Sequence, residues 1–208
     1  MKELAMMCIL TITATAVQSE PFTIAERGKP RCVIATNQQQ EHTELAKELA
    51  GWLQRVVGAE GFSIQTLPTT QPVIVLATAE QFPDVAQRER LAELGSEGYL
   101  IRSEAKRLWL LANTTLGLQH AVYRLLEEAG CRWFFADPAW WVIPRKPTLR
   151  VNVNLREKPA FKDRVIWYNW GANTPTLAEN YRTWFKANRQ GGHFPVRAGH
   201  AYEAYVHY

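Results

Sequence analysis

Short apolar runs alternate with helical patterns along much of this 208-residue chain. Residues 32–36 and 73–77 are almost continuously apolar, which is typical of strands covered on both faces. Between them, apolar side chains recur at the three- and four-residue spacing of an amphipathic helix, at Leu45, Leu49, Trp52, Leu53 and Val56. We expect this helix to begin near Thr43, a possible N-cap, and to end at Gly58.

The same alternation continues as far as Gly130. Further strands are predicted over residues 62–67, 99–101 and 108–111, and further helices over 86–94 and 115–129. The strands at 99–101 and 108–111 flank a charged segment and predict a hairpin. Residues 20–145 are therefore expected to form a non-catalytic α/β domain, a sandwich with a mixed β-sheet covered by helices.

The pattern changes after Gly130, where aromatic residues and prolines become frequent. We interpret residues 146–160 as a linker and expect a new strand-helix unit beyond it, with a strand at 164–168 and a helix from Thr176 to Gly191. This unit resembles the first βα unit of a TIM barrel, which needs about 250 residues. Residues 161–208 are thus expected to be the start of a truncated (β/α)₈ barrel, with Trp167, Trp170, Trp184 and Phe185 uncovered.

The first 19 residues predict a secretory signal peptide, because a short charged start is followed by an apolar stretch over 4–17. An ordinary buried N-terminal segment is the alternative, and an uncleaved anchor is disfavoured because the stretch falls short of the ~20 residues that a bilayer requires. We expect a secreted or periplasmic protein, with no membrane contact after cleavage. Cys32 and Cys131 would remain, as two buried thiols rather than a disulfide.

Composition and motifs exclude several classes of function. The formal net charge is +4 and Lys and Arg are not clustered, so no nucleic-acid partner is expected. The sequence contains no Gly-rich phosphate loop, no CxxC pair and no GxSxG elbow. The histidines at 193, 200 and 207 repeat every seven residues, but the glycines among them argue against a helix that would gather them around a metal. We therefore expect no cofactor and no metal.

A set of short motifs occurs in an order that points to a known family. The motifs are Glu97-Gly98-Tyr99-Leu100-Ile101, Leu108-Trp109-Leu110-Leu111-Ala112-Asn113, Gly117-x-x-x-Ala121-Val122-Tyr123-x-x-Leu126-Glu127, Gly130-Cys131-Arg132-Trp133-Phe134, Ile143-Pro144 and Pro159-x-Phe161-x-x-Arg164. In this order they resemble the N-terminal domain that precedes the catalytic barrel in family 67 α-glucuronidases and family 20 β-N-acetylhexosaminidases. The resemblance covers about residues 30–170.

The resemblance implies the N-terminal part of a secreted glycoside hydrolase, α-glucuronidase-like, that acts in polysaccharide or glycoside breakdown. Its partner would be a carbohydrate, a uronic-acid or amino-sugar glycoside. The catalytic carboxylates of such enzymes lie later in the barrel, so this piece is expected to be inactive alone and its catalytic residues stay unassigned. The alternative is a non-catalytic carbohydrate-binding or interaction module. The sequence leaves the sugar, the linkage and the oligomeric state open.

Four residues are candidates for substrate binding: Arg164, Trp167, Trp170 and His200. The resemblance implies that Arg164 contacts sugar hydroxyls, and its fork of N–H donors also suits a uronate carboxylate. The alternative is that Arg164 seals the interface between the two domains by pairing with Asp163 or with a carboxylate of the connector. Indole faces can stack on pyranose rings, although buried structural tryptophans are more common. The aromatic residues at 133–135 and 140–141 are either a sugar platform or packing between domains.

Overall fold

A computed structural model of the protein describes residues 19–166 and 175–191, and a six-stranded mixed sheet lies at its centre. The strands across the sheet, in spatial order, are β11 (Asn154–Glu157), β6 (Tyr99–Ser103), β7 (Arg107–Ala112), β5 (Val73–Thr78), β3 (Val33–Thr36) and β4 (Ile64–Thr66). Strands β4, β3, β5 and β7 run parallel, whereas β6 pairs antiparallel with both β7 and β11. The predicted hairpin at β6 and β7 is confirmed.

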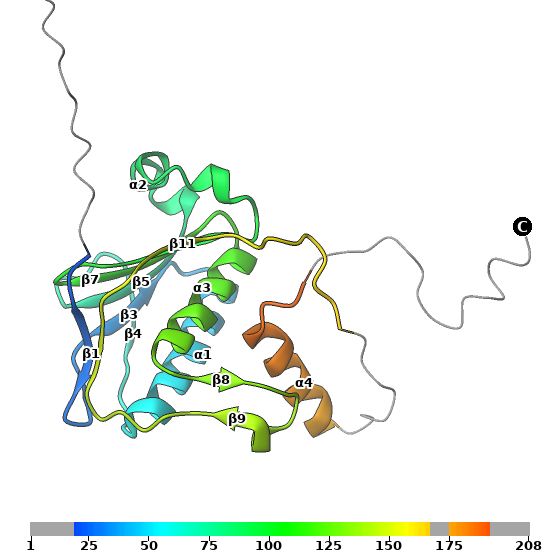
Figure 1. The fold of residues 1–208 in the computed structure, drawn as a ribbon. Helices are drawn as coiled ribbons and strands as arrows, with labels where there is room; N and C mark the ends of the chain where they lie inside the picture. Colours follow the sequence, from blue (N-terminus) through cyan, green and yellow to red (C-terminus); the bar gives the residue numbers. More distant parts are fainter. Residues whose placement is uncertain (1–18, 167–174, 192–208) are drawn as a thin grey trace, which may run out of the picture.

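Helices cover the two faces of this sheet unequally (Figure 1). Helices α1 (Gln40–Val57) and α3 (Thr115–Glu128) pack on one face, and α4 (Pro175–Ala187) packs against α3. Within residues 19–166 and 175–191, the other face carries short helical segments alone, namely η1 (Ala79–Gln81), α2 (Pro83–Arg88) and η2 (Leu91–Leu94). The mixed α/β sandwich is therefore thick on the α1 side and thin on the other.

Two smaller sheets complete the described part of the chain. Strand β1 (Phe22–Glu26) lies between β10 (Leu149–Val151) and β2 (Lys29–Pro30), and β8 (Arg132–Trp133) pairs with β9 (Trp141–Val142) after η3 (Pro138–Trp140). Strands β10 and β11 both fall inside the predicted linker 146–160, and they pair with β1 and β6. The last residues of this segment thus extend the main sheet, while the division of the chain into domains stays a prediction.

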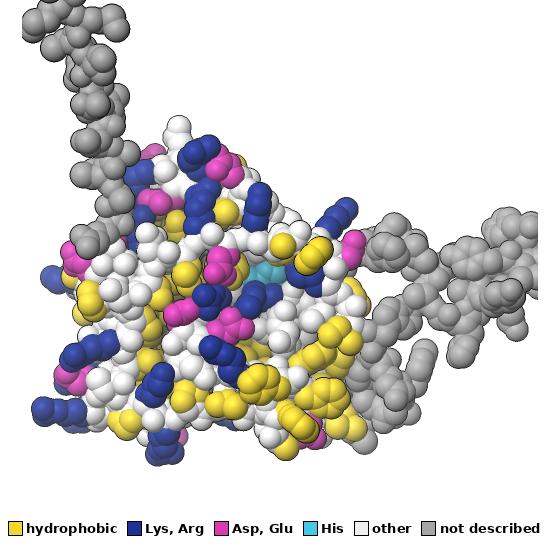
Figure 2. Space-filling view, viewed as in Figure 1, with side chains coloured by type: hydrophobic (Ala, Val, Ile, Leu, Met, Phe, Trp, Pro, Cys, Tyr) yellow, Lys and Arg dark blue, Asp and Glu magenta, His cyan; other side chains and the backbone are white. Residues whose placement is uncertain are grey.

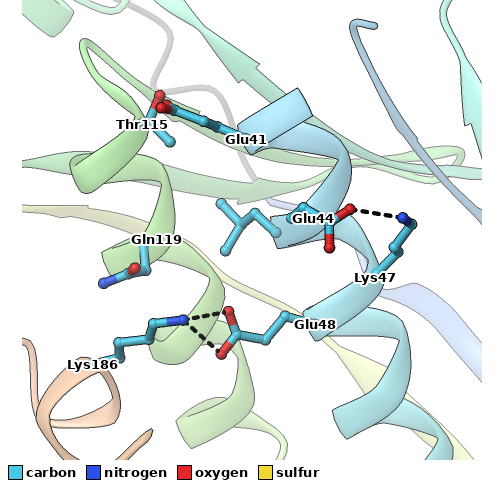
Figure 3. Close-up of a pocket in the computed structure, with 8 residues that line it drawn as sticks. Glu41, Glu44, Lys47, Glu48, Thr115, Gln119 and Lys186 are labelled. Carbon is cyan, nitrogen blue, oxygen red and sulfur yellow. Dashed lines mark hydrogen bonds and ion pairs between the residues drawn. The ribbon is translucent and has the colours of Figure 1, made fainter. Parts of the chain in front are cut away.

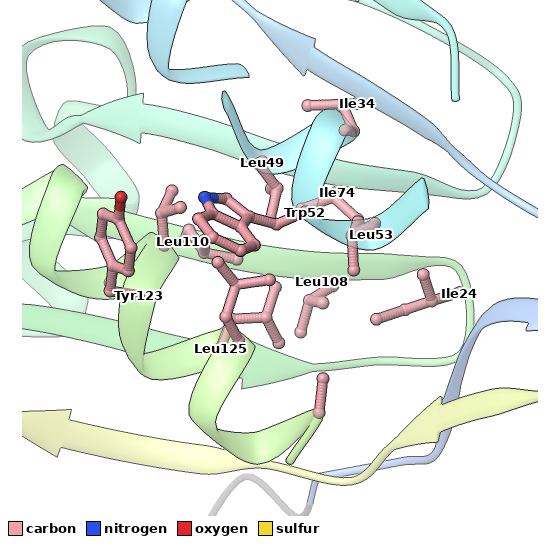
Figure 4. Packing of buried hydrophobic residues seen from close by; sticks show 14 of the residues in the cluster. Ile24, Ile34, Leu49, Trp52, Leu53, Ile74, Leu108, Leu110, Tyr123 and Leu125 are labelled. Atoms are coloured by element: carbon pink, nitrogen blue, oxygen red, sulfur yellow. The ribbon is translucent and has the colours of Figure 1, made fainter. Parts of the chain in front are cut away.

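The main core lies between the sheet and helices α1 and α3 (Figure 4). The side chains of Leu49 and Leu53 on α1, Ile74 on β5 and Leu108 and Leu110 on β7 are all fully buried. Burying each such side chain stabilises the fold by about 1.5–3 kcal/mol. A second, smaller cluster lies on the other sheet face, beneath η1, α2 and η2.

Several helix boundaries differ from the predicted ones. Helix α1 begins at Gln40, and Thr43 lies within it, where its hydroxyl donates to the Gln39 carbonyl oxygen at 3.1 Å. Hydroxyl bonding to the preceding turn is common inside helices, so a threonine near a helix start does not fix the first residue. Gly58 does end α1, with φ of 74° in the left-handed region. The helix predicted over 86–94 is broken at Arg90, whose φ is 50°.

The C-terminal unit is packed more closely than expected. Helix α4 begins at Pro175 and ends at Ala187, and Trp184 is only 8% exposed, so the expectation that this side chain is uncovered is wrong. The reason is that α4 packs against α3 of the α/β domain. The predicted strand at 164–168 is represented by one bridge between Arg164 and Gly191, and residues 167–168 lie outside the described part of the chain.

Cys32 and Cys131 are both buried free thiols, as predicted. Among the described residues, no helix combines the length and the apolar character needed to cross a bilayer.

Candidate functional site

Arg164, the one substrate-binding candidate among the described residues, lies where the α/β domain meets the unit that contains α4. Its Nε donates to the Arg189 carbonyl oxygen at 3.0 Å, and Nη1 donates to the carbonyl oxygens of Phe161 at 2.5 Å and Lys162 at 3.3 Å. Its Nη2 forms an ion pair with the Glu97 carboxylate. The other three candidates, at positions 167, 170 and 200, lie outside the described residues.

These contacts use most of the N–H donors of the Arg164 guanidinium. An arginine has five N–H donors and no acceptor, and here four protein oxygens accept from it. The backbone of Arg164 also pairs with Gly191, through hydrogen bonds of 2.7 and 3.2 Å. Arg164 therefore joins residues that are far apart in sequence, which is the geometry of an interface-sealing arginine.

A polar pocket of about 270 Å³ lies beside Arg164. Its walls include Tyr99 from β6, His120 from α3 and Glu157 from β11, together with Asn188 and Arg189 after α4. The pocket thus lies between the sheet edge, α3 and the end of α4.

His120 is the most deeply buried polar residue of this pocket, with no exposed surface. Its Nδ1 lies 2.9 Å from the Glu97 carbonyl oxygen, and because a carbonyl can only accept, Nδ1 carries the proton. Its Nε2 has no hydrogen-bond partner among the described residues. Burial lowers the pKa of His120, so the imidazole is neutral at pH 7 and presents an acceptor at Nε2.

Tyr99, Glu157 and Arg124 form a second polar group at the pocket. The Tyr99 hydroxyl donates to the Glu157 carboxylate at 2.5 Å, and Arg124 Nε donates to the same carboxylate at 3.2 Å. Burial, and then the bond to Glu157, raise the pKa of Tyr99, so it remains a neutral donor. These contacts join β11 to α3, and they leave Glu157 paired with a cation rather than free to act as an acid or base.

Further polar contacts hold α4 and the residues after it on the α/β domain. Lys186 Nζ lies 3.2 Å from the Glu48 carboxylate on α1, an ion pair at the side of a groove between α1 and α3 (Figure 3). Arg189 pairs with Glu127 at 3.0 Å. We call the ion pairs of Arg164, Lys186 and Arg189 with their glutamates the interdomain clamp, after the predicted division of the chain at residues 146–160.

Sequence reasoning identified Arg164 and missed its partners. Glu97 belongs to one of the quoted motifs, but nothing in the sequence says which cation a loop glutamate meets. His120 had a usable signal, since it lies on the apolar side of a helix between Leu118 and Ala121. A histidine at such a position must either find a partner or stay neutral.

The aromatic connection between β8 and β9 is strongly exposed. Phe134, Phe135 and Trp140 are 66%, 58% and 61% exposed, and Figure 2 shows apolar side chains gathered over this part of the molecule. By contrast, Trp133 and Trp141 point inward and contact Trp52 at ring-centre distances of 5.2 and 5.9 Å. Part of the aromatic cluster is thus core packing, and part is open to a partner.

The fold of this chain is similar to part of a larger glycosidase. A family GH115 4-O-methyl-α-glucuronidase with specificity for decorated arabinogalactans superimposes with a TM-score of 0.51 at 15% identity, covering 82% of this chain and 25% of that one. An N-acetyl-β-hexosaminidase from Streptomyces plicatus gives 0.47 at 20% identity, covering 72% and 26%. A GH20 exo-β-N-acetylglucosaminidase from Vibrio harveyi gives 0.43 at 17% identity, covering 72% and 18%.

The chain therefore spans about a quarter or less of the length of these solved structures. At 15% identity, the likeness to the GH115 enzyme shows a shared fold and not a shared activity. No curated protein sequence matches the chain. A family model described as the glycosyl hydrolase family 67 N-terminus matches residues 17–125. Because this match spans more than half of the 208 residues, the chain belongs to the glycosyl hydrolase family 67 N-terminal family.

Proposed function

We propose that this chain is the N-terminal part of a secreted, α-glucuronidase-like glycoside hydrolase that acts in polysaccharide or glycoside breakdown. Membership of the family supports a glycoside-hydrolase-related role. The α/β domain itself is non-catalytic in this proposal, and its task is to hold the first unit of the catalytic barrel. The observation that carries this role is the interdomain clamp.

A physical need for such a clamp follows from the residues of α4. A single strand-helix unit cannot bury its own apolar face, and exposed aromatic surface favours aggregation. Here α3 and the β8 connection cover Trp184, and Asn188 Nδ2 donates to the Trp133 carbonyl oxygen at 2.9 Å. The α/β domain thereby supplies the surface on which the next domain is built.

The substrate in this proposal is a uronic-acid or amino-sugar glycoside, bound by the barrel through Arg164, Trp167, Trp170 and His200. The test substitutes Arg164 in a form of the protein that carries a complete barrel. If Arg164 binds sugar in addition to its place in the clamp, Arg164→Ala lowers kcat/KM per folded molecule by about 30- to 1000-fold, beyond any effect of its lower stability. If it only seals the interface, the melting temperature falls and activity per folded molecule stays near wild type, which would remove Arg164 from the sugar site.

Turnover by the chain itself tests the non-catalytic role. Glycoside hydrolysis uses two carboxyl groups about 5–9 Å apart across the scissile bond, and Glu97 and Glu157 are each paired with an arginine. Purified residues 20–208 should release no chromophore from nitrophenyl α-glucuronide or nitrophenyl β-N-acetylglucosaminide. Turnover that Glu157→Gln or Glu97→Gln abolishes would contradict the proposal.

The length of the reading frame and the start of the mature protein test the predicted barrel and the predicted secretion. Sequencing of the reading frame beyond codon 208 should find about 200 or more further codons, since a complete barrel needs about 250 residues. N-terminal sequencing of the exported protein should place the mature start near residue 20. A stop codon shortly after codon 208 would contradict the predicted barrel. A mature protein that still begins at Met1 would contradict the predicted signal peptide.

A carbohydrate-binding module remains the second candidate, because Phe134, Phe135 and Trp140 are exposed on a connection that forms its own hydrogen bonds. Asp137 Oδ1 accepts from the Ala139 N–H at 2.8 Å, and the Trp141 indole donates to the Phe135 carbonyl oxygen at 2.9 Å. Affinity electrophoresis in soluble glucuronoxylan tests this function. Retardation that Trp140→Ala abolishes and the exposed control Leu116→Ala retains would favour the module.

A further inference from the structure

An apolar cleft of about 310 Å³ opens on the thin side of the sandwich, away from α1, α3 and the interdomain clamp. Its floor is formed by neighbouring residues of β5 and β7, with Val73 opposite Arg107 and Val75 opposite Trp109. Its walls are Leu67 and Pro68 after β4 and Phe82 after η1. The volume lies at the low end of the range for small-molecule sites, about 300–1,000 Å³.

The side chains that line the cleft are suited to bind a flat aromatic ring. Trp109 is 6% exposed, and Phe82 meets it edge to face with ring centres 5.3 Å apart. Valine methyl groups from the strands complete the apolar surface. Aromatic pairs prefer edge-to-face or offset arrangements, so a third ring can extend this pair without disturbing it.

Three polar side chains line the cleft. The Thr69 hydroxyl accepts from the Gln71 N–H at 3.3 Å, whereas Arg107 and Trp109 only donate and are incompletely used. The buried Trp109 Nε1 has no acceptor among the described residues, and a buried N–H without an acceptor costs about 1–3 kcal/mol. Arg107 precedes Trp109 by two residues on β7, so both side chains lie on the same sheet face. Its guanidinium carbon lies 5.6 Å from the Trp109 ring centre, and it forms no ion pair with a carboxylate in the described part of the chain.

We propose that this cleft binds a small aromatic carboxylate, with the ring packed on Phe82 and Val75 beside Trp109 and the carboxylate toward Arg107. A carboxylate accepts hydrogen bonds only, so it complements the exposed Arg107 guanidinium, which only donates. The site is independent of the proposed glycosidase role, since none of its residues belongs to the clamp or to the barrel-like unit.

The test uses benzoate as the probe and benzamide as its neutral analogue of nearly the same shape. Titrations are followed in ¹H–¹⁵N spectra at the indole N–H of Trp109, which Trp109→Phe assigns. Benzoate should shift this resonance, with Kd on the order of 1 mM for so small a ligand. Arg107→Gln should weaken benzoate binding about three- to fivefold and leave the weaker benzamide binding unchanged.

A matched control is Arg150→Gln, an exposed arginine on β10 that is remote from the cleft and should not change benzoate binding. Arg107 is itself exposed, so its substitution is not expected to unfold the chain. The proposal is overturned if benzoate leaves the Trp109 resonance unmoved up to about 20-fold above the expected Kd. It is equally overturned if Arg107→Gln weakens benzoate and benzamide alike, because the carboxylate would then have no role.

Discussion

The ion pair between Arg164 and Glu97 should be the strongest polar link of the interdomain clamp. Both side chains are largely buried, 18% and 19% exposed, and Arg164 adds hydrogen bonds to the carbonyl oxygens of Arg189 and Phe161. Removing one partner of a mostly buried pair leaves the other charge poorly solvated, at a cost of about 1.5–3 kcal/mol. We expect Glu97→Gln to cost about 1–2 kcal/mol and Arg164→Gln about 2–3 kcal/mol, because the arginine loses more bonds.

The assay is a double-mutant cycle on the 208-residue chain, with guanidinium unfolding followed by tryptophan fluorescence. The coupling free energy between the two substitutions should be about 1 kcal/mol or more, and a loss of 2 kcal/mol should lower Tm by about 4–8 °C. The control pair, Arg31 with Glu26, is 49% and 35% exposed and should show less than about 1 kcal/mol. A coupling within about 0.3 kcal/mol of zero at Arg164 and Glu97 would refute the clamp.

Three further predictions concern buried groups. Trp184→Ala should lower the unfolding free energy by about 3–5 kcal/mol, measured by guanidinium unfolding, because the indole is buried between α4 and α3; a loss below 1 kcal/mol would contradict the packing. Burial lowers the pKa of both His42 and His120, so the unfolded chain binds more protons below pH about 6.5; the unfolding free energy should change little between about pH 6.5 and 8 and fall as the solution becomes more acidic than that, and a rise on acidification would contradict the sign. Burial raises the pKa of Cys32 to about 12 and that of Cys131 to about 11, so neither thiol should react with a disulfide reagent at pH 8 until the chain unfolds, and rapid labelling of the native chain would contradict this.

Local signals in the sequence explain which elements could be predicted. Strand β5 and the hairpin of β6 and β7 are continuous apolar runs, and α3 combines an apolar stripe with Gly130 at its end, where φ is 103°. The break at Arg90 could not be predicted, because an arginine with φ of 50° has no local signature. The pairing of β10 with β1 joins residues more than 120 positions apart, and alternation alone indicates a strand without indicating its partner.

In the candidate site, too, the sequence indicates the functional residue but not the residue that it contacts. Arg164 was identified because a motif and a donor-rich side chain point to recognition, yet its carboxylate partner lies 67 positions away. Trp184 was expected to be uncovered, because its own segment offers nothing to pack on it. The covering residues come from α3 and from the β8 connection, and only the three-dimensional fold brings them there.

Hydrogen exchange along α4 tests most directly whether the α/β domain holds the unit that follows it. If the clamp and Trp184 fix α4 on α3, amides of residues 179–187 should exchange through the same global opening as those of residues 119–128, and Glu97→Gln should increase exchange in α4 more than in α3. Complete exchange of α4 within seconds, while α3 stays protected, would contradict the account.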